Sequence, residues 1–356
     1  MSQARQIPHG PVMLDVAGIE LTDEDRQRLI HPLVGGVILF TRNYASPDQL
    51  TRLTREIHAL RQPPLLIAVD HEGGRVQRFR DGFTALPAMR ELGVIWDSNP
   101  AQAKRLAQHV GHVLAAELRA HGVDLSLTPV LDVDHGNSSV IGDRAFHSDL
   151  HAISELALGL IHGLKEGGMS SVGKHFPGHG HVKADSHHET PVDERPYAAI
   201  AASDLQPFRR LIENGLGGIM PAHVIYPDVD DKVAGFSEIW LKQILRGKLG
   251  FDGMIFSDDL SMVAASGAGG MAERARAAFD AGCDMVLVCN NPQASDELLA
   301  QLEYSMPAIA LARLARIHGR GGPESPSQLQ HDKNYLDAVA AVRSIGVKKG
   351  ELPLFR

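Results

Sequence analysis

Charged and imidazole side chains follow several short apolar runs in this sequence, where they could carry out acid/base or nucleophilic chemistry. Asp70 ends one run and is followed by a glycine turn that leads to Arg78. Lys174 and His175 end another run, and Asp258 ends a third. Each residue alone has an ordinary structural explanation, because an Asp after a strand often caps a helix and cations often pair with carboxylates. Together they predict a site where a carboxylate, a cation and an imidazole act on one bound molecule.

A glycine- and histidine-rich segment follows Lys174 and holds two further candidates, Asp185 and His187. Histidine titrates near neutral pH and can donate and then recover a proton, while a neighbouring carboxylate fixes its tautomer. Five of the 19 histidines lie between His175 and His188, so a metal-dependent hydrolase is an alternative. Against it, the first apolar run has no His-x-His pattern, and these histidines are not on a helix at the i, i+4 spacing of a zinc site. We therefore expect no metal and no organic cofactor.

Eight short apolar runs, each the length of a buried strand, recur along the chain. They are Val12–Val16, Val34–Phe40, Leu65–Asp70, Leu125–Val133, Ser171–His175, Gly218–Val224, Met254–Asp258 and Met285–Cys289. Stretches with helical periodicity lie between most of them: Asp48–Leu60, Ala101–Ala120, Ile153–Lys165, Ala198–Ile212, Glu238–Lys248 and Met271–Ala281. Several stretches stop at a glycine just before the next run, at Gly122, Gly167-Gly168, Gly215, Gly250 and Gly282.

Alternating strands and helices predict parallel strands with right-handed crossovers, and eight strands are enough to close a barrel. We predict an α/β protein with a single-domain (β/α)8 TIM barrel over residues 1–320. A doubly wound open sheet is the competing architecture, but Val16–Glu20 does not match its glycine-rich phosphate loop. Barrel enzymes build their sites at the C-terminal ends of the strands, which would gather Asp70, Arg144, Lys174 and Asp258 on one rim.

The remainder of the chain predicts packing elements. Gln293–Arg316 has apolar residues at helical spacing and is expected to form one long closing helix. Gly319–Pro326 is a Gly/Pro/Ser-rich linker. We expect residues 321–356 to form a linker, a helix and a tail packed on the barrel.

Composition and charge exclude several classes of protein. With 356 residues, 44% hydrophobic and 22% charged, the chain can bury a full core and is not of the disordered class. The 35 Lys and Arg against 43 Asp and Glu give a net charge of -8, so nucleic acid is not an expected partner. No apolar run approaches the roughly 18 to 20 residues of a spanning helix, and Met1–Pro11 has no signal pattern. Cys283 and Cys289 form no disulfide framework, so we expect a protein of the reducing cytoplasm. Because no spanning helix is expected, we expect no membrane partner either.

Four motifs lie at the predicted strand ends. They are Asp70–Arg78 (DHEGGRVQR), Lys174–Gly180 (KHFPGHG) continuing to Asp185–His187, Met220–His223 (MPAH) and Ser257–Met262 (SDDLSM). They resemble the motifs of family 3 glycoside hydrolases, and within that family the single-domain bacterial β-N-acetylhexosaminidases of cell-wall recycling. The resemblance covers nearly the whole chain, and the combination of four motifs makes it specific.

The resemblance implies a role for each matching residue. Asp258 corresponds to the nucleophile, which forms a covalent glycosyl-enzyme intermediate, and His187, oriented by Asp185, corresponds to the acid/base. The positions expected to hold the N-acetylglucosamine unit are Asp70, Arg78, Arg144, Lys174 and His175. His71 stands where many relatives have glutamine, a departure beside the sugar site.

The resemblance also implies a substrate. We expect a retaining exo-β-N-acetylglucosaminidase that hydrolyses terminal non-reducing GlcNAc from GlcNAc-1,6-anhydro-MurNAc, with or without peptide. Its partner would be this small amino sugar or muropeptide, and its pathway would be peptidoglycan recycling, with effects on cell shape, cell division and β-lactam resistance. A metal-dependent barrel hydrolase and a non-catalytic sugar-binding protein remain alternatives, and phosphate could replace water as the attacking group.

Overall fold

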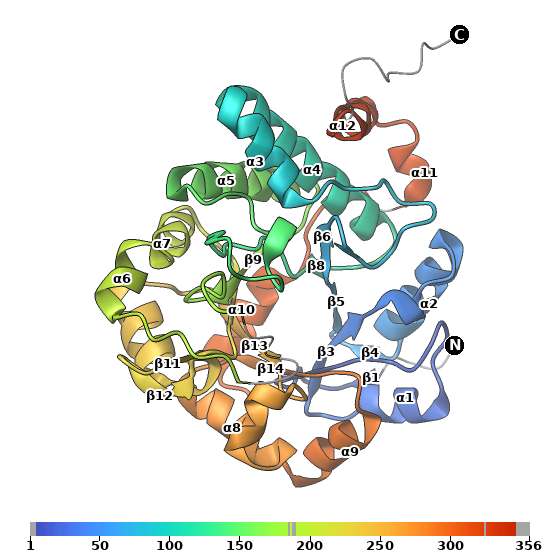
Figure 1. Cartoon of the computed structure of the whole chain (residues 1–356). Coiled ribbons are helices and arrows are strands. Elements are labelled where there is room, and N and C mark those ends of the chain that lie inside the picture. The colour runs from blue at the N-terminus through green and yellow to red at the C-terminus, as the bar shows by residue number, and fades with distance from the viewer. Residues whose placement is uncertain (1–4, 184–185, 187–189, 324, 347–356) are drawn as a thin grey trace.

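Eight parallel strands form a ring at the centre of the computed structural model, which describes residues 5–183, 186, 190–323 and 325–346 (Figure 1). In sheet order they are β8 (Leu125–Ser126), β5 (Leu66–Val69), β3 (Val34–Leu39), β2 (Val12–Leu14), β14 (Met285–Val288), β13 (Met254–Asp259), β10 (Gly218–Pro221) and β9 (Val172–Phe176). Each lies within, or one residue beyond, one of the eight predicted runs.

The ring closes between the first and last strands of this order. After the two-residue strand β8, the chain continues alongside β9, where Val172 N donates to Thr128 O at 2.7 Å and Lys174 N donates to Pro129 O at 3.1 Å. Leu131 N in turn donates to Lys174 O at 2.6 Å. These hydrogen bonds, which we call the β8/β9 seam, complete a closed barrel and confirm the predicted TIM-barrel fold.

Side chains alternate between two apolar cores, as the two-residue period of a strand requires. Val12 and Leu14 pack in the core beneath the helices, whereas Met13 between them belongs to a second cluster inside the barrel. Leu314 and Ile317, from helix α10 (Ala308–Ile317), join this inner cluster. Helix α10 therefore closes one end of the barrel, which leaves the other end for a site.

Helices surround the ring (Figure 1). They are α1 (Asp23–Leu29), α2 (Pro47–Ala59), α3 (Met89–Ser98), α4 (Pro100–Ala120), α5 (Leu150–Glu166), α6 (Tyr197–Ala202), α7 (Leu205–Glu213), a π-helix at Ile239–Lys248, α8 (Met271–Ala281) and α9 (Pro292–Gln301). Short two-stranded sheets join β1 (Arg5–Gln6) to β4 (Arg61–Gln62), β6 (His71–Gly73) to β7 (Val76–Gln77), and β11 (Ile225–Tyr226) to β12 (Asp230–Val233).

Two helix predictions are wrong in extent. The expected helix Ala198–Ile212 is two helices, α6 and α7, broken at Ser203-Asp204, where the buried Asp204 carboxylate binds Arg195 at 2.8 Å. The expected helix Gln293–Arg316 is also two helices, α9 and α10, because the second begins immediately after Pro307, which cannot continue a preceding helix.

Each predicted helix–glycine–strand junction contains a glycine with positive φ. The angles are 78° at Gly122, 79° at Gly168, 80° at Gly215, 69° at Gly250 and 123° at Gly282. Glycine reaches this left-handed region without the clash that a Cβ would cause, and so ends the helix and turns the chain into the next strand.

The C-terminal part continues through α11 (Pro326–Leu329) into α12 (Lys333–Arg343), which packs against α4. Tyr335 on α12 donates a 2.8 Å hydrogen bond to the buried Glu117 carboxylate on α4. The division of the chain at residue 320 stays a prediction. Within the part of the chain that the structure describes, no helix is both long and apolar enough to cross a membrane.

Candidate active site

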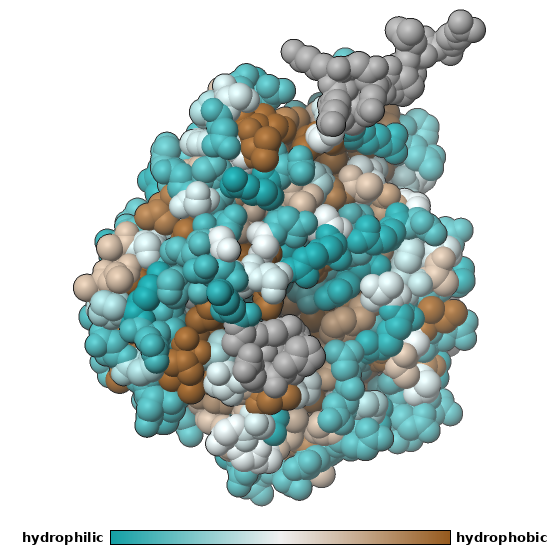
Figure 2. Space-filling model, in the orientation of Figure 1, coloured by the Kyte–Doolittle hydropathy of each residue, from teal (hydrophilic) through white to brown (hydrophobic). Residues whose placement is uncertain are grey.

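A pocket of about 470 Å³ opens at the C-terminal end of the strands, opposite the end that α10 closes. Figure 2 shows the surface hollowed near the centre of this face, with hydrophilic side chains gathered along one side. Six of the predicted site residues line the pocket: Asp70, Arg78, Arg144, Lys174, His175 and Asp258. The structure therefore brings together side chains from four strand ends and their loops, those of β5, β8, β9 and β13, while their individual roles stay predictions.

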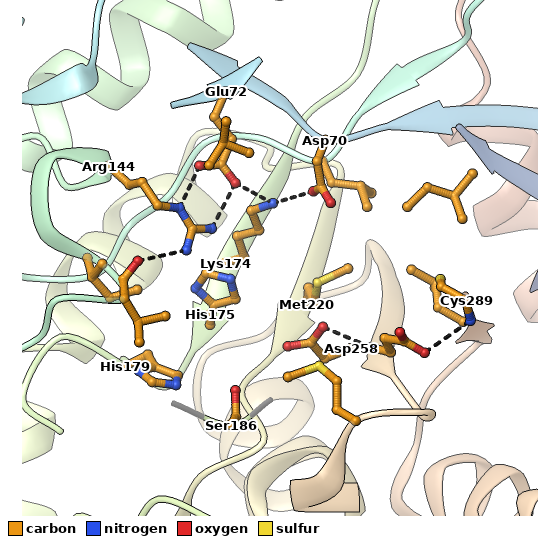
Figure 3. A pocket seen from close by; sticks show the side chains of 18 of the residues that line it. Asp70, Glu72, Arg144, Lys174, His175, His179, Ser186, Met220, Asp258 and Cys289 are labelled. Atoms are coloured by element: carbon orange, nitrogen blue, oxygen red, sulfur yellow. Dashed lines mark hydrogen bonds and ion pairs between the residues drawn. The ribbon is translucent and has the colours of Figure 1, made fainter. Parts of the chain in front are cut away.

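One wall of the pocket is a buried ion-pair network (Figure 3). The Lys174 Nζ lies 2.7 Å from Asp70 Oδ1 and 2.7 Å from Glu72 Oε1. Arg144 donates to both Glu72 oxygens, from Nε and Nη2, at 2.8 Å each. Arg78 adds a longer contact of 3.5 Å to Asp70 Oδ2. The network fixes five charged side chains in one geometry, which suits a site that must orient several polar groups of a bound molecule.

The same network keeps its acids and bases charged. Burial alone would raise the pKa of the Asp70 and Glu72 carboxyls, but Lys174, together with Arg78 at Asp70 and Arg144 at Glu72, outweighs burial and holds both pKa values low. Burial would lower the pKa of Lys174, but the two carboxylates raise it. The wall therefore presents fixed anions and fixed cations at neutral pH.

The carboxylate of Asp132 holds the next part of the wall. Its Oδ2 lies 2.7 Å from His175 Nδ1, and its Oδ1 accepts the backbone N–H of His179 at 2.7 Å. Burial would raise the pKa of the Asp132 carboxyl, but His175 brings it below its ordinary value. A carboxylate on Nδ1 leaves Nε2 as the nitrogen that His175 can offer to a ligand.

Among the described carboxylates that line the pocket, Asp258 makes the fewest hydrogen bonds and ion pairs. It lies near the end of β13 and accepts one hydrogen bond, from Asp259 N at 2.8 Å, among the described residues. Asp259 is bound by Ser261 N and Oγ and by Cys289 N, while burial and the charge of Asp258 raise its pKa to about 6. Asp258 is thus a carboxyl group at a strand end that lines the pocket and has few protein contacts among the described residues.

Two predicted catalytic residues, Asp185 and His187, lie outside the described residues. Ser186 between them is described and lines the pocket, and its carbonyl accepts a 3.2 Å hydrogen bond from Ala264 N.

Glu72, which links Lys174 to Arg144, is a pocket residue that was not among those expected from the sequence. Residues 70 and 72 flank His71 in extended backbone, so their side chains point to the same side while that of His71 points away. An Asp-x-Glu spacing at a strand end was the signal. His71 packs instead against the Phe79 and Phe83 rings, at centroid distances of 5.8 and 5.9 Å. The side chain at the position where many relatives have glutamine is therefore directed away from the pocket.

The histidine-rich segment was the basis of the metal alternative. Among the described residues, no group of three or more His, Cys, Asp or Glu side chains is arranged to hold a metal ion. His181 faces His135, whose ring nitrogen contacts Asp204 at 3.2 Å, beneath the rim.

The sequence of this chain matches a known family over most of its length. Residues 10–318 match the glycosyl hydrolase family 3 N terminal domain. A Beta-hexosaminidase of Nitrosospira multiformis is 64% identical over 345 residues, which are 97% of this chain and 99% of the relative. A Beta-hexosaminidase of Methylobacillus flagellatus is 62% identical over 344 residues, with 97% and 99% covered.

Solved structures share the fold closely. NagZ from Neisseria gonorrhoeae, in complex with N-trifluoroacetyl-D-glucosamine, superposes with a TM-score of 0.92 at 52% identity and covers 96% of this chain and all of its own. A family 3 β-N-acetylglucosaminidase from Paenibacillus superposes with a TM-score of 0.83 at 31% identity, over 93% of this chain and 66% of its own.

Proposed function

Because the chain belongs to glycosyl hydrolase family 3 and is a β-hexosaminidase, we propose that it removes terminal β-linked N-acetylglucosamine by a retaining, exo-acting mechanism. Its substrate is GlcNAc-1,6-anhydro-MurNAc, with or without peptide, released during peptidoglycan turnover. The observation that carries the proposal is Asp258, a carboxyl group with one hydrogen bond among the described residues, in a pocket whose other wall is a rigid polar network.

In the proposed first step, a carboxylate oxygen of Asp258 forms a bond to the anomeric carbon as the bond to the leaving oxygen breaks. His187, oriented by Asp185, gives its proton to that oxygen. In the second step water attacks the anomeric carbon, the glycosyl ester to Asp258 breaks, and the proton of the water returns to His187. Two displacements at one carbon retain the β configuration.

The proposed sugar-binding residues are Asp70, Arg78, Arg144, Lys174 and His175. Donors and acceptors fixed in ion pairs do not need to be reorganised when a hydroxyl binds, which supports recognition of one defined sugar. The pocket has a volume of about 470 Å³, and apolar side chains fill the barrel at its other end. A pocket that is closed below in this way supports cleavage of a single sugar from the end of a substrate. The sugar analogue bound by NagZ, a close structural relative, supports the amino-sugar class.

The anhydro-muropeptide substrate and the cytoplasm are proposed together. After His187 has given up its proton, its imidazole is neutral and does not repel an anionic leaving group. This supports an aglycone that carries acidic groups. Both cysteines, Cys283 and Cys289, are buried and unpaired, as is usual in a reducing compartment.

The test compares release of p-nitrophenol from its β-N-acetylglucosaminide and its β-glucoside, followed by GlcNAc release from GlcNAc-1,6-anhydro-MurNAc. Proton NMR of the first-formed sugar reports the anomer. We expect the acetamido substrate to be strongly preferred and the β anomer to appear first. An α product would contradict retention, and inactivity on both aryl glycosides would favour a sugar-binding protein.

For Asp258→Asn we expect at least a roughly 1,000-fold lower kcat, because the amide cannot form the glycosyl ester. Binding of N-acetylglucosamine, measured by calorimetry, should persist. Exposed Glu238→Gln is the matched control and should retain full turnover. Wild-type turnover by Asp258→Asn would remove this residue from the mechanism.

A further inference from the structure

Among the described residues of the pocket, His179 is a buried imidazole whose ring nitrogens make no hydrogen bond. Its exposed fraction is 3%, and neither ring nitrogen has a hydrogen-bond partner among the described residues. It lines the same pocket as Asp258, and its ring lies 6.1 Å from the His175 ring, centre to centre. Figure 3 shows it on the His175 side of the pocket. Two buried unpaired nitrogens are costly, so a ligand that satisfies one of them gains affinity.

The backbone holds this imidazole in a fixed position. His179 N donates to Asp132 Oδ1 at 2.7 Å, and the preceding carbonyl, of Gly178, accepts a 2.7 Å hydrogen bond from the Tyr226 hydroxyl. On the other side, Gly180 packs so closely that a Cβ there would lie 1.9 Å from Val133 O. The ring is therefore preorganised before any ligand arrives.

The imidazole differs chemically from the ion-pair wall. Burial and the neighbouring His175 lower the pKa of His179, against the opposing charges of Asp132 and Asp258, so the ring is neutral at pH 7. A neutral imidazole offers one donor and one acceptor nitrogen. Asp70, Glu72 and Lys174 already bind one another, whereas His179 offers both nitrogens to a ligand.

The neighbouring nucleophile indicates which group of the sugar His179 meets. If Asp258 attacks the anomeric carbon, the next ring carbon carries the 2-acetamido group, a neutral amide with one N–H and one carbonyl. The pocket also has apolar side chains, among them Val140, Ile141 and Met262, that can contact the acetyl methyl.

We infer that a ring nitrogen of His179 hydrogen-bonds the 2-acetamido group of the bound sugar and thereby selects N-acetylglucosamine over glucose. The inference rests on the proposed function, since it takes a glycoside with Asp258 at its anomeric carbon. A site built to bind a polar group discriminates strongly against the analogue that lacks it.

The experiment measures kcat/KM for the p-nitrophenyl β-N-acetylglucosaminide and β-glucoside, and N-acetylglucosamine and glucose binding by calorimetry, in wild type, His179→Phe and His179→Asn. We expect His179→Phe to lower kcat/KM for the acetamido substrate about 10- to 100-fold, but the glucoside value less than about 3-fold. N-acetylglucosamine affinity should fall in parallel, with His179→Asn intermediate. The matched control is His112→Phe on α4, a part-buried histidine whose ring nitrogens are likewise unpaired among the described residues, which should leave the substrate ratio unchanged.

Equal losses on both sugars, or no loss on either, would overturn the inference. If His179→Phe does not fold, as judged by circular dichroism, His179→Asn decides by the same ratio. If the wild type releases p-nitrophenol from neither substrate, the proposed function fails. The inference about His179 is then decided by calorimetry, from the ratio of N-acetylglucosamine affinity to glucose affinity in wild type and in His179→Asn.

Discussion

The single carboxylate of Glu72 lies against two buried positive charges, those of Lys174 and Arg144. It lies 2.7 Å from Lys174 Nζ and accepts two 2.8 Å hydrogen bonds from Arg144. Removing one member of a buried ion pair leaves charge without compensation, so we expect Glu72→Gln to lower the free energy of unfolding by about 3–5 kcal/mol. Urea denaturation measures this loss.

The control for Glu72→Gln is the same exchange at Glu238, which pairs with Lys242 at 3.0 Å on the surface. Surface pairs contribute roughly 0–1 kcal/mol, so this variant should unfold nearly as the wild type does. Equal effects of the two substitutions would contradict a structural role for the buried network.

His71 makes stability depend on pH. Burial and nearby Arg80 and Arg78 lower its pKa to about 3, below that of an unfolded histidine, so only the unfolded chain binds a proton between these values. The contribution of neutral, buried His71 to the free energy of unfolding is therefore present above about pH 6.5 and is lost as pH falls. From pH 7 to pH 5, wild type should lose about 2 kcal/mol more than His71→Gln in urea titrations.

The control for His71→Gln is His162→Gln, an exposed position on α5. Parallel pH profiles for wild type and His71→Gln would show that His71 does not carry this dependence.

The residue types at strand ends predicted much of the pocket. Asp70, Arg144, Lys174 and Asp258 stand far apart in sequence, yet barrel geometry requires their strand ends to meet at one rim. Glu72 could have been selected, because its Asp-x-Glu spacing from Asp70 places both side chains on one side of an extended segment. His179 could not, because sequence does not reveal which histidine is buried in the pocket without a hydrogen-bond partner among the described residues. That property depends on the direction of the backbone after the strand.

Helices α4 and α5 pack in close contact through glycines, and they lie side by side in Figure 1. A Cβ on Gly163 would lie 1.9 Å from Gln108 O, and one on Gly111 would lie 2.1 Å from Leu160 O. Because backbone atoms cannot move aside cheaply, we expect Gly163→Ala to reduce the free energy of unfolding by about 1–3 kcal/mol. Thermal and urea unfolding provide the measurement.

Gly247→Ala is the comparison for the helix contact. Gly247 is exposed in the π-helix, and a Cβ there would come no closer than 3.3 Å to its nearest neighbour, Lys242 O. The free energy of unfolding of the Gly247→Ala variant should stay within about 1 kcal/mol of the wild-type value. If Gly163→Ala is equally mild, the two helices can separate without cost.

The strands were more predictable than the helices. A buried strand appears in the sequence as a continuous apolar run, and a glycine that ends the preceding helix stands just before it. Both signals are local in the sequence. The break between α6 and α7 depends instead on Asp204 turning inward to Arg195, nine residues earlier in the loop before α6. Periodicity continues across such a break, so the sequence alone predicted one helix where two exist.

The molecule as a whole should work without a metal ion, because the proposed steps need only a carboxylate, an imidazole and water. We expect EDTA to leave kcat/KM for the β-N-acetylglucosaminide unchanged in the full chain. Loss of activity that zinc restores would assign a metal to the histidine-rich segment and revive the alternative of a metal-dependent hydrolase.

The β8/β9 seam links activity to completion of the barrel. Lys174 closes the ring with its backbone N–H and carbonyl, while its side chain holds Asp70 and Glu72 across the pocket. A chain in which this seam is open does not hold Lys174 beside Asp70 and Glu72, and so lacks the proposed sugar-binding wall. The return of turnover during refolding therefore reports that the seam has closed.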